Sequence, residues 1–122
     1  MAAVPKPTGK KKKKKLYNGY KDKGDRVCFY CGSPFAERHE VYRGSNRQNS
    51  IRYGFQVDLC PSCHDGITNL RSDEDIARDQ YWKKRCQREF EAEMIREHGL
   101  SKEGARELFM EIIGRNYLEE LL

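Results

Sequence analysis

The chain has 122 residues, of which 37% are hydrophobic and 35% are charged, which suffices for one domain with a thin core. A domain this small and polar usually needs disulfides or a metal to stabilise it, and the odd number of five cysteines argues against a fully paired disulfide framework. No apolar run is long enough for a signal peptide or a transmembrane helix, so we expect a cytoplasmic protein with metal-ligating thiols and no membrane partner.

The net charge of +5 is unevenly distributed, because residues 1–26 carry ten Lys or Arg and two Asp, whereas residues 72–122 are acidic overall. We predict that residues 1–26 form a disordered basic arm that contacts nucleic-acid phosphates, with Tyr17 and Tyr20 available for base stacking. Its six consecutive lysines are Lys10, Lys11, Lys12, Lys13, Lys14 and Lys15. The alternative is a solubilising tail or a targeting signal.

Two Cys-x2-Cys pairs, separated by 28 residues, give the strongest signal in the chain. They contain Cys28 and Cys31, then Cys60 and Cys63. Each pair is typical of a zinc knuckle, a tight turn that carries two cysteines, and two knuckles present four thiolates to one Zn²⁺ in a tetrahedral site with Zn–S distances of about 2.3 Å. Such a site is structural, since four thiolates leave no open position for water. A redox dithiol and an iron–sulfur cluster are the alternatives.

Between and after the knuckles the pattern predicts an α+β unit over residues 27–71. Residues 38–42 and 55–59 are expected to be strands, residues 43–52 a polar loop, and Pro61 the first turn of a short helix.

Residues 72–122 are predicted to be a helical C-terminal extension of the same domain. A long helix is expected from the N-cap Ser72 to the stop at Gly99, and a second helix from Ser101 to Gly114. The stripe that contains Trp82 and Cys86 repeats every four residues, which predicts that both side chains are packed in the core.

Two histidines of the 27–71 block are not needed by the zinc. If the helix at Cys63 packs on the strands, His39 and His64 point at one spot and form an open site for Mg²⁺, Mn²⁺ or a second Zn²⁺, with Glu40 as a neighbouring base. The alternative is that His64 only hydrogen-bonds a zinc thiolate and His39 is a packed strand residue.

Four arginines in the first strand and the loop are candidate phosphate contacts. They are Arg38, Arg43, Arg47 and Arg52. The alternative is a solvated loop without a nucleic-acid role.

The motifs Cys28-x2-Cys31-Gly32, His39-Glu40-Val41 and Leu59-Cys60-x2-Cys63-His64 resemble the HNH, or ββα-metal, nuclease family in its four-cysteine form. With Gly44-x-Asn46-Arg47-x2-Ser50-x2-Tyr53-Gly54 and the tail Gly114-Arg115-Asn116-Tyr117-Leu118, the likeness extends to small phage and prophage proteins of the HNH-like nuclease group. It covers roughly residues 27–118.

The resemblance implies a treble-clef zinc domain and a metal-dependent DNA endonuclease. Carried over, His39 and His64 fall at the two metal positions, and Glu40 falls where most members have a histidine base. The family's asparagine has no counterpart shortly before the second cysteine pair, so Asn46 or Asn49 would substitute for it.

Three functional hypotheses follow. The first is a phage-type HNH-like protein that binds nucleic acid, DNA in the first place, and cuts it in the host cytoplasm with Mg²⁺ or Mn²⁺. The second is a non-catalytic zinc module that binds nucleic acid through the lysine arm and the arginines. The third is a zinc-stapled adaptor or inhibitor whose acidic region 72–122 docks on a phage or host protein.

Overall fold

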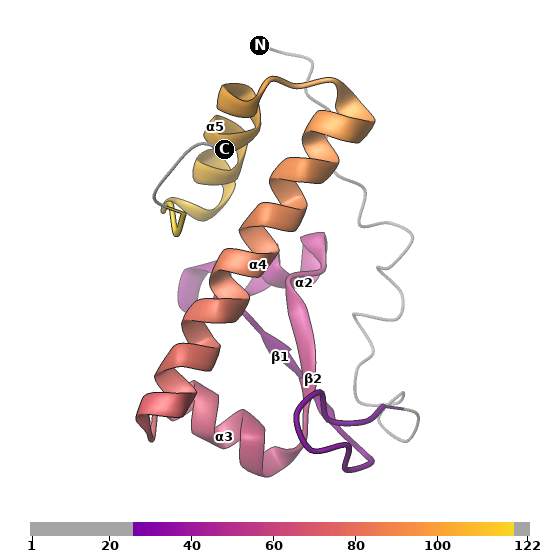
Figure 1. Cartoon of the computed structure of the whole chain (residues 1–122), viewed down its shortest axis with the longest axis vertical. Helices are drawn as coiled ribbons and strands as arrows, with labels where there is room; N and C mark the ends of the chain where they lie inside the picture. The colour runs from indigo at the N-terminus through magenta and orange to yellow at the C-terminus, as the bar shows by residue number, and fades with distance from the viewer. Residues whose placement is uncertain (1–25, 119–122) are drawn as a thin grey trace.

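The computed structural model describes residues 26–118, and the predicted basic arm lies outside them except for Arg26. The elements along the chain are β1 (Glu37–Glu40), the 3-10 turn η2 (Gly44–Asn46), α2 (Arg47–Tyr53), β2 (Gln56–Leu59), α3 (Pro61–Asn69), α4 (Asp73–His98) and α5 (Lys102–Ile113). The fold is therefore a small α+β arrangement, as the sequence predicted. Figure 1 shows α4 running along the molecule, with α3 beside its start and α5 beside its later half.

The two strands form an antiparallel hairpin in which His39 is opposite Val57 and Glu40 is opposite Gln56. The sequence placed β1 at residues 38–42, whereas the strand begins one residue earlier and ends two residues earlier. Because side chains alternate across a strand, Glu37 and His39 share one face with the buried Val57, and Glu40 lies on the other. The hairpin thus separates an inner, partly apolar face from an outer, polar one.

The predicted loop over residues 43–52 is wrong, because most of it forms η2 and α2. The helix is held by contacts that are distant in sequence. The Ser50 hydroxyl accepts from the Tyr42 N–H at 3.0 Å and donates to the Tyr42 carbonyl at 2.7 Å. The amide of Asn49 donates to the carbonyl of Ile112 at 3.1 Å, and Gly54 ends the helix in the left-handed region at φ 79°.

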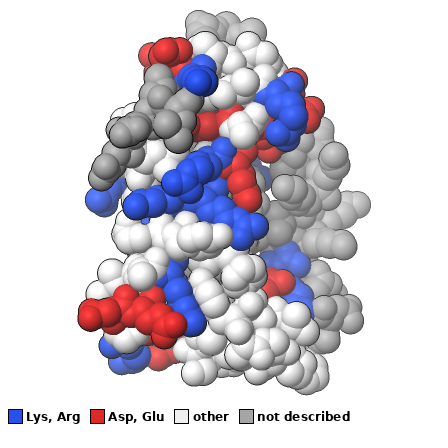
Figure 2. Space-filling view, viewed as in Figure 1, with Lys and Arg blue, Asp and Glu red and all other residues white. Residues whose placement is uncertain are grey.

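The two C-terminal helices have the predicted limits. The Ser72 hydroxyl accepts from the Asp75 N–H, the Ser101 hydroxyl accepts from the Gly104 N–H, and both helices end at a glycine with positive φ. Figure 2 shows one group of acidic side chains over the start of α4 and a group of Lys and Arg side chains over its middle.

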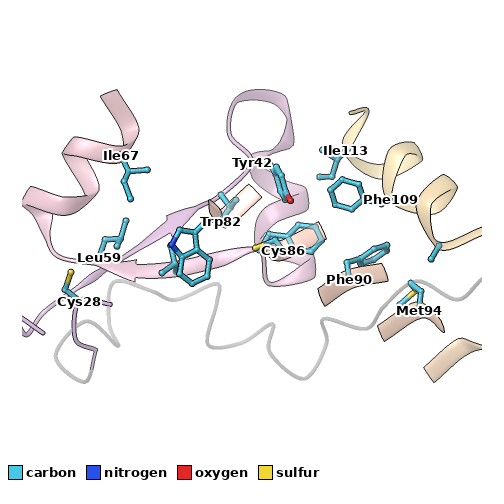
Figure 3. Packing of buried hydrophobic residues seen from close by; sticks show 14 of the residues in the cluster. Cys28, Tyr42, Leu59, Ile67, Trp82, Cys86, Phe90, Met94, Phe109 and Ile113 are labelled. Carbon is cyan, nitrogen blue, oxygen red and sulfur yellow. The ribbon is translucent and has the colours of Figure 1, made fainter. Parts of the chain in front are cut away.

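One apolar cluster joins the hairpin to the helices (Figure 3). In its centre Phe109 of α5 lies 5.7 Å from the Tyr42 ring, 6.1 Å from Phe55 and 5.8 Å from Phe90. Cys86 is buried in the same cluster, as predicted, and burial raises the pKa of its thiol to about 12. Residues 27–71 and 72–118 therefore share a core.

A buried polar network ties the segment that follows α5 to α4. Gln87 donates to Asn116 Oδ1 and accepts from the Tyr117 N–H, both at 2.8 Å, and it also donates to Glu91.

Within residues 26–118 no helix is both long and apolar enough to cross a membrane.

Candidate metal centre

Four cysteine sulfurs, from Cys28, Cys31, Cys60 and Cys63, are placed to hold one metal ion. Their Sγ atoms all lie within 4.8 Å of one another, and Cys31 Sγ is 3.6 Å from Cys60 Sγ. A tetrahedron with Zn–S distances of about 2.3 Å has sulfur–sulfur edges of about 3.8 Å, so the observed spacing fits the ion that the sequence predicted. An all-thiolate donor set also suits a soft or borderline ion far better than Mg²⁺ or Ca²⁺.

Each cysteine pair is positioned by a tight backbone turn. In the first pair, the Cys31 N–H points at Cys28 Sγ at 3.5 Å, and Gly32 permits the turn with φ 74°. In the second pair, Cys60 caps α3 by accepting from the Cys63 N–H at 3.5 Å, and Pro61 occupies the first helical position. Two local turns thus aim four sulfurs at one point.

The thiols have very different proton affinities. Burial disfavours the Cys28 thiolate, but hydrogen bonds from the backbone, that of Cys31 first, lower its pKa to about 6. Burial, and then the neighbouring sulfurs of Cys60 and Cys28, raise the pKa of Cys63 to about 12. Four sulfurs this close carry four negative charges only beside a cation, so metal binding must release protons.

The structure brings the two predicted histidines together beside this cluster. His39 comes from β1 and His64 from the first turns of α3, and their ring centroids are 5.1 Å apart at an interplanar angle of 76°. His39 is only 2% exposed, and this burial, followed by the neighbouring His64, lowers its pKa to about 4. The His39 imidazole is therefore neutral near pH 7, as a metal ligand must be.

The spacing of the two rings is compatible with one shared ion. Two imidazoles that bind one metal at about 2.1 Å have ring centroids about 5 Å apart. In the described part of the chain, the cysteines are the one group of three or more His, Cys, Asp and Glu residues whose ligand atoms gather so closely. Oxygens of water or substrate would therefore complete the coordination of an ion at the imidazoles.

Glu37 is a site residue that the sequence reasoning missed. Its Oε1 lies 2.8 Å from His64 Nδ1. With the carboxylate as acceptor, Nδ1 carries the proton and Nε2 presents its lone pair, which is the usual arrangement around metal-bound histidines. A signal for it was present, since Glu37 precedes His39 by two positions and so lies on the same strand face.

The other two predicted catalytic residues have different neighbours. Glu40 accepts from Gln56 Nε2 at 3.2 Å and pairs with Arg47 at 3.5 Å on the outer face of the hairpin. Asn46 donates to the carbonyl of Ile113 at 2.9 Å, at the C-terminal end of α5. These contacts give both residues a structural role, and their catalytic roles stay predictions.

The four predicted arginines do not share one partner. Arg38 pairs with Asp58 at 3.5 Å and Arg43 with the buried Asp79 at 3.1 Å. Arg47 and Arg52 are exposed, and Arg52 lies over the Tyr53 ring. The two exposed arginines are the ones available to a phosphate.

Comparisons with protein-family models, with curated proteins and with solved structures each returned no match for this chain. The functional interpretation therefore rests on the geometry of the cysteine cluster and the histidine pair.

Proposed function

We propose that this protein is a treble-clef zinc protein of the HNH type, akin to those of small phages, that binds DNA and hydrolyses its phosphodiester bonds. The observation that carries the proposal is the pair of imidazoles, one from β1 and one from α3, with ring centroids 5.1 Å apart beside the four cysteines. A hairpin followed by a helix, with a metal ligand on each, is what the resemblance in sequence led us to expect.

In this proposal the cysteines have a purely structural part. Zn²⁺ bound by four thiolates has no position left for water, so it does no chemistry. Its binding contributes on the order of 10 kcal/mol to folding, which compensates for a thin core. It also fixes the start of α3, because Cys60 caps that helix and His64 lies four residues further on.

The histidines have the reactive part. A divalent ion such as Mg²⁺ or Mn²⁺ at His39 and His64 supplies Lewis-acid activation of the scissile phosphate. His39, neutral through burial, and His64, oriented by Glu37, are the groups of this chain that would hold it. Glu40 is bound to Arg47 and Gln56, so we do not assign it the role of base.

The test is cleavage of supercoiled plasmid by the zinc-loaded chain with added Mg²⁺ or Mn²⁺. We expect nicked and linear products from the parent protein and none from His39→Ala or His64→Ala. His98→Ala is the matched control, since His98 lies in the last turn of α4, and it should cut normally. Intact plasmid with every metal, or unchanged cleavage by His39→Ala, would contradict the nuclease proposal.

A second candidate is a zinc module that binds nucleic acid without cutting it. The observation in its favour is that Glu40, at the position of the family's base, and Asn46, a candidate substitute for its asparagine, are held in structural contacts. Intact plasmid together with salt-sensitive binding of DNA would support this candidate.

A further inference from the structure

Aromatic side chains gather around Trp82, at the junction of the first knuckle and α4. The Phe29 ring lies 5.0 Å from Trp82 and the Tyr81 ring 5.4 Å from it, both edge-to-face. Trp82 is buried, and its Nε1 donates to the Tyr30 hydroxyl at 2.8 Å. The buried indole thus holds the two flanking rings in place.

Those two rings are far more exposed than packing requires. Phe29 is 52% exposed and Tyr81 is 48% exposed, and both come next in sequence to a buried residue. Neighbouring large apolar side chains that stay in solvent mark binding surfaces more often than isolated ones do.

Cations lie one and two helical turns beyond Tyr81. Lys84, Arg85 and Arg88 follow it at spacings of three, four and seven residues, which places all four on one face of α4. The Arg85 guanidinium lies 4.7 Å from the centroid of the Trp82 ring, and Glu89 pairs with it at 2.9 Å. Figure 2 shows Lys and Arg side chains over the middle of α4, with an uncharged area beside them.

We propose that Phe29, Tyr81, Lys84, Arg85 and Arg88, which we term the Trp82 surface, bind single-stranded nucleic acid. Unpaired bases would stack on Phe29 and Tyr81, and their phosphates would contact Lys84 and Arg88. Fixed aromatic rings beside a row of cations are the two components of sequence-tolerant single-strand binding. A duplex offers no free base face to the rings, and an acidic protein partner would use the cations without needing both aromatic faces.

This inference rests on the nucleic-acid binding in the proposed function, and not on cleavage, and it deepens that binding by adding a single-stranded ligand and a surface separate from the histidines. The test uses the full zinc-loaded chain without added Mg²⁺ or Mn²⁺, and the anisotropy of a labelled oligo-dT of about 20 nucleotides, longer than typical single-strand sites. Phe29→Ala and Tyr81→Ala should each weaken binding about fivefold or more, the loss of one base stack. Phe35→Ala is the matched control, since Phe35 is 59% exposed and lies four residues after Cys31, and it should bind like the parent.

Two further measurements test where the single-stranded DNA binds. The double variant Lys84→Gln/Arg88→Gln should reduce the slope of log K against log salt concentration by about 1.4, the value for two phosphate contacts. The exposed pair Arg96→Gln/Lys102→Gln, near the end of α4 and the start of α5, should leave that slope unchanged. Because Trp82 is the single tryptophan of the chain, its fluorescence should change as oligo-dT binds and remain constant when a duplex is added.

Equal affinity of the parent, Phe29→Ala and Tyr81→Ala for oligo-dT would overturn the proposal. The absence of any oligonucleotide binding would overturn it too, and would indicate that this surface binds a protein partner.

The outcome of the nuclease test is separate from this one. Intact plasmid with binding that depends on Phe29 and Tyr81 refutes the nuclease and supports this surface. Cleaved plasmid, together with Phe29→Ala and Tyr81→Ala variants that bind oligo-dT like the parent, supports the nuclease and refutes this surface.

Discussion

Replacing Arg106 by Met should destabilise the domain strongly, because it leaves the Glu91 carboxylate buried without its cation. Arg106 contacts both Glu91 oxygens, at 2.7 and 3.3 Å, and the two side chains are only 13% and 11% exposed. Removing one partner of such a pair usually costs about 3–5 kcal/mol. The remaining hydrogen bond from Gln87 at 2.8 Å compensates for part of this, so we expect a loss of about 3 kcal/mol.

The same site provides an internal control. In Glu91→Gln/Arg106→Met neither charge remains, so the double variant should lose less than the sum of the two single losses, by about 1–3 kcal/mol. Urea unfolding of the zinc-loaded proteins, followed by the fluorescence of Trp82, gives all four free energies. Additive losses would refute the reasoning, because they are typical of residues that do not interact. A loss below about 0.5 kcal/mol for Arg106→Met would refute it as well, because losses of that size are typical of surface substitutions.

Three further predictions concern the core, a cap and the metal. Phe109→Ala should lower the free energy of unfolding by about 3–5 kcal/mol, measured by urea unfolding, because the ring is fully buried among three aromatic side chains. Ser72→Ala should cost about 1 kcal/mol, since it removes the acceptor for the Asp75 N–H, and the exposed Ser62→Ala on α3 should change little. A strong chelator should make all five thiols, buried Cys86 included, react with iodoacetamide, because the roughly 10 kcal/mol of metal binding is comparable to the whole stability of a small domain. Labelling of four thiols while Cys86 stays protected would show instead that the fold survives without metal.

The parts of the fold that were predicted are those whose determinants are local. Ser72 and Gly99 limit α4 because a cap acts within a few residues of itself, and the two cysteine pairs need only short turns. The helix α2 was missed for the opposite reason. It depends on Ser50 bonding to Tyr42 and Asn49 bonding to the end of α5, and neither contact is visible in the pattern of residues 43–52.

The candidate site divides in the same way. That His39 and His64 meet was expected on the condition that the helix after Cys60 packs on the hairpin, and α3 does contact both strands. The spacing of Glu37 and His39 could have placed Glu37 on the same strand face, but the bond from Glu37 to His64, 27 positions away, is seen only in the structure. The partners of Glu40 and Arg43 were hidden for the same reason, because Arg47 lies on a helix that was predicted as loop and Asp79 is buried on α4.

The central claim is that one chain has two distinct metal sites, a structural one of four cysteines and an open one at His39 and His64. Metal content after equilibrium dialysis against Zn²⁺ and then Mn²⁺, measured by mass spectrometry, tests it most directly. The account predicts one zinc and one manganese per chain for the parent protein, and one zinc without manganese for His39→Ala and for His64→Ala. One zinc alone in the parent, or manganese retained by both variants, would contradict it.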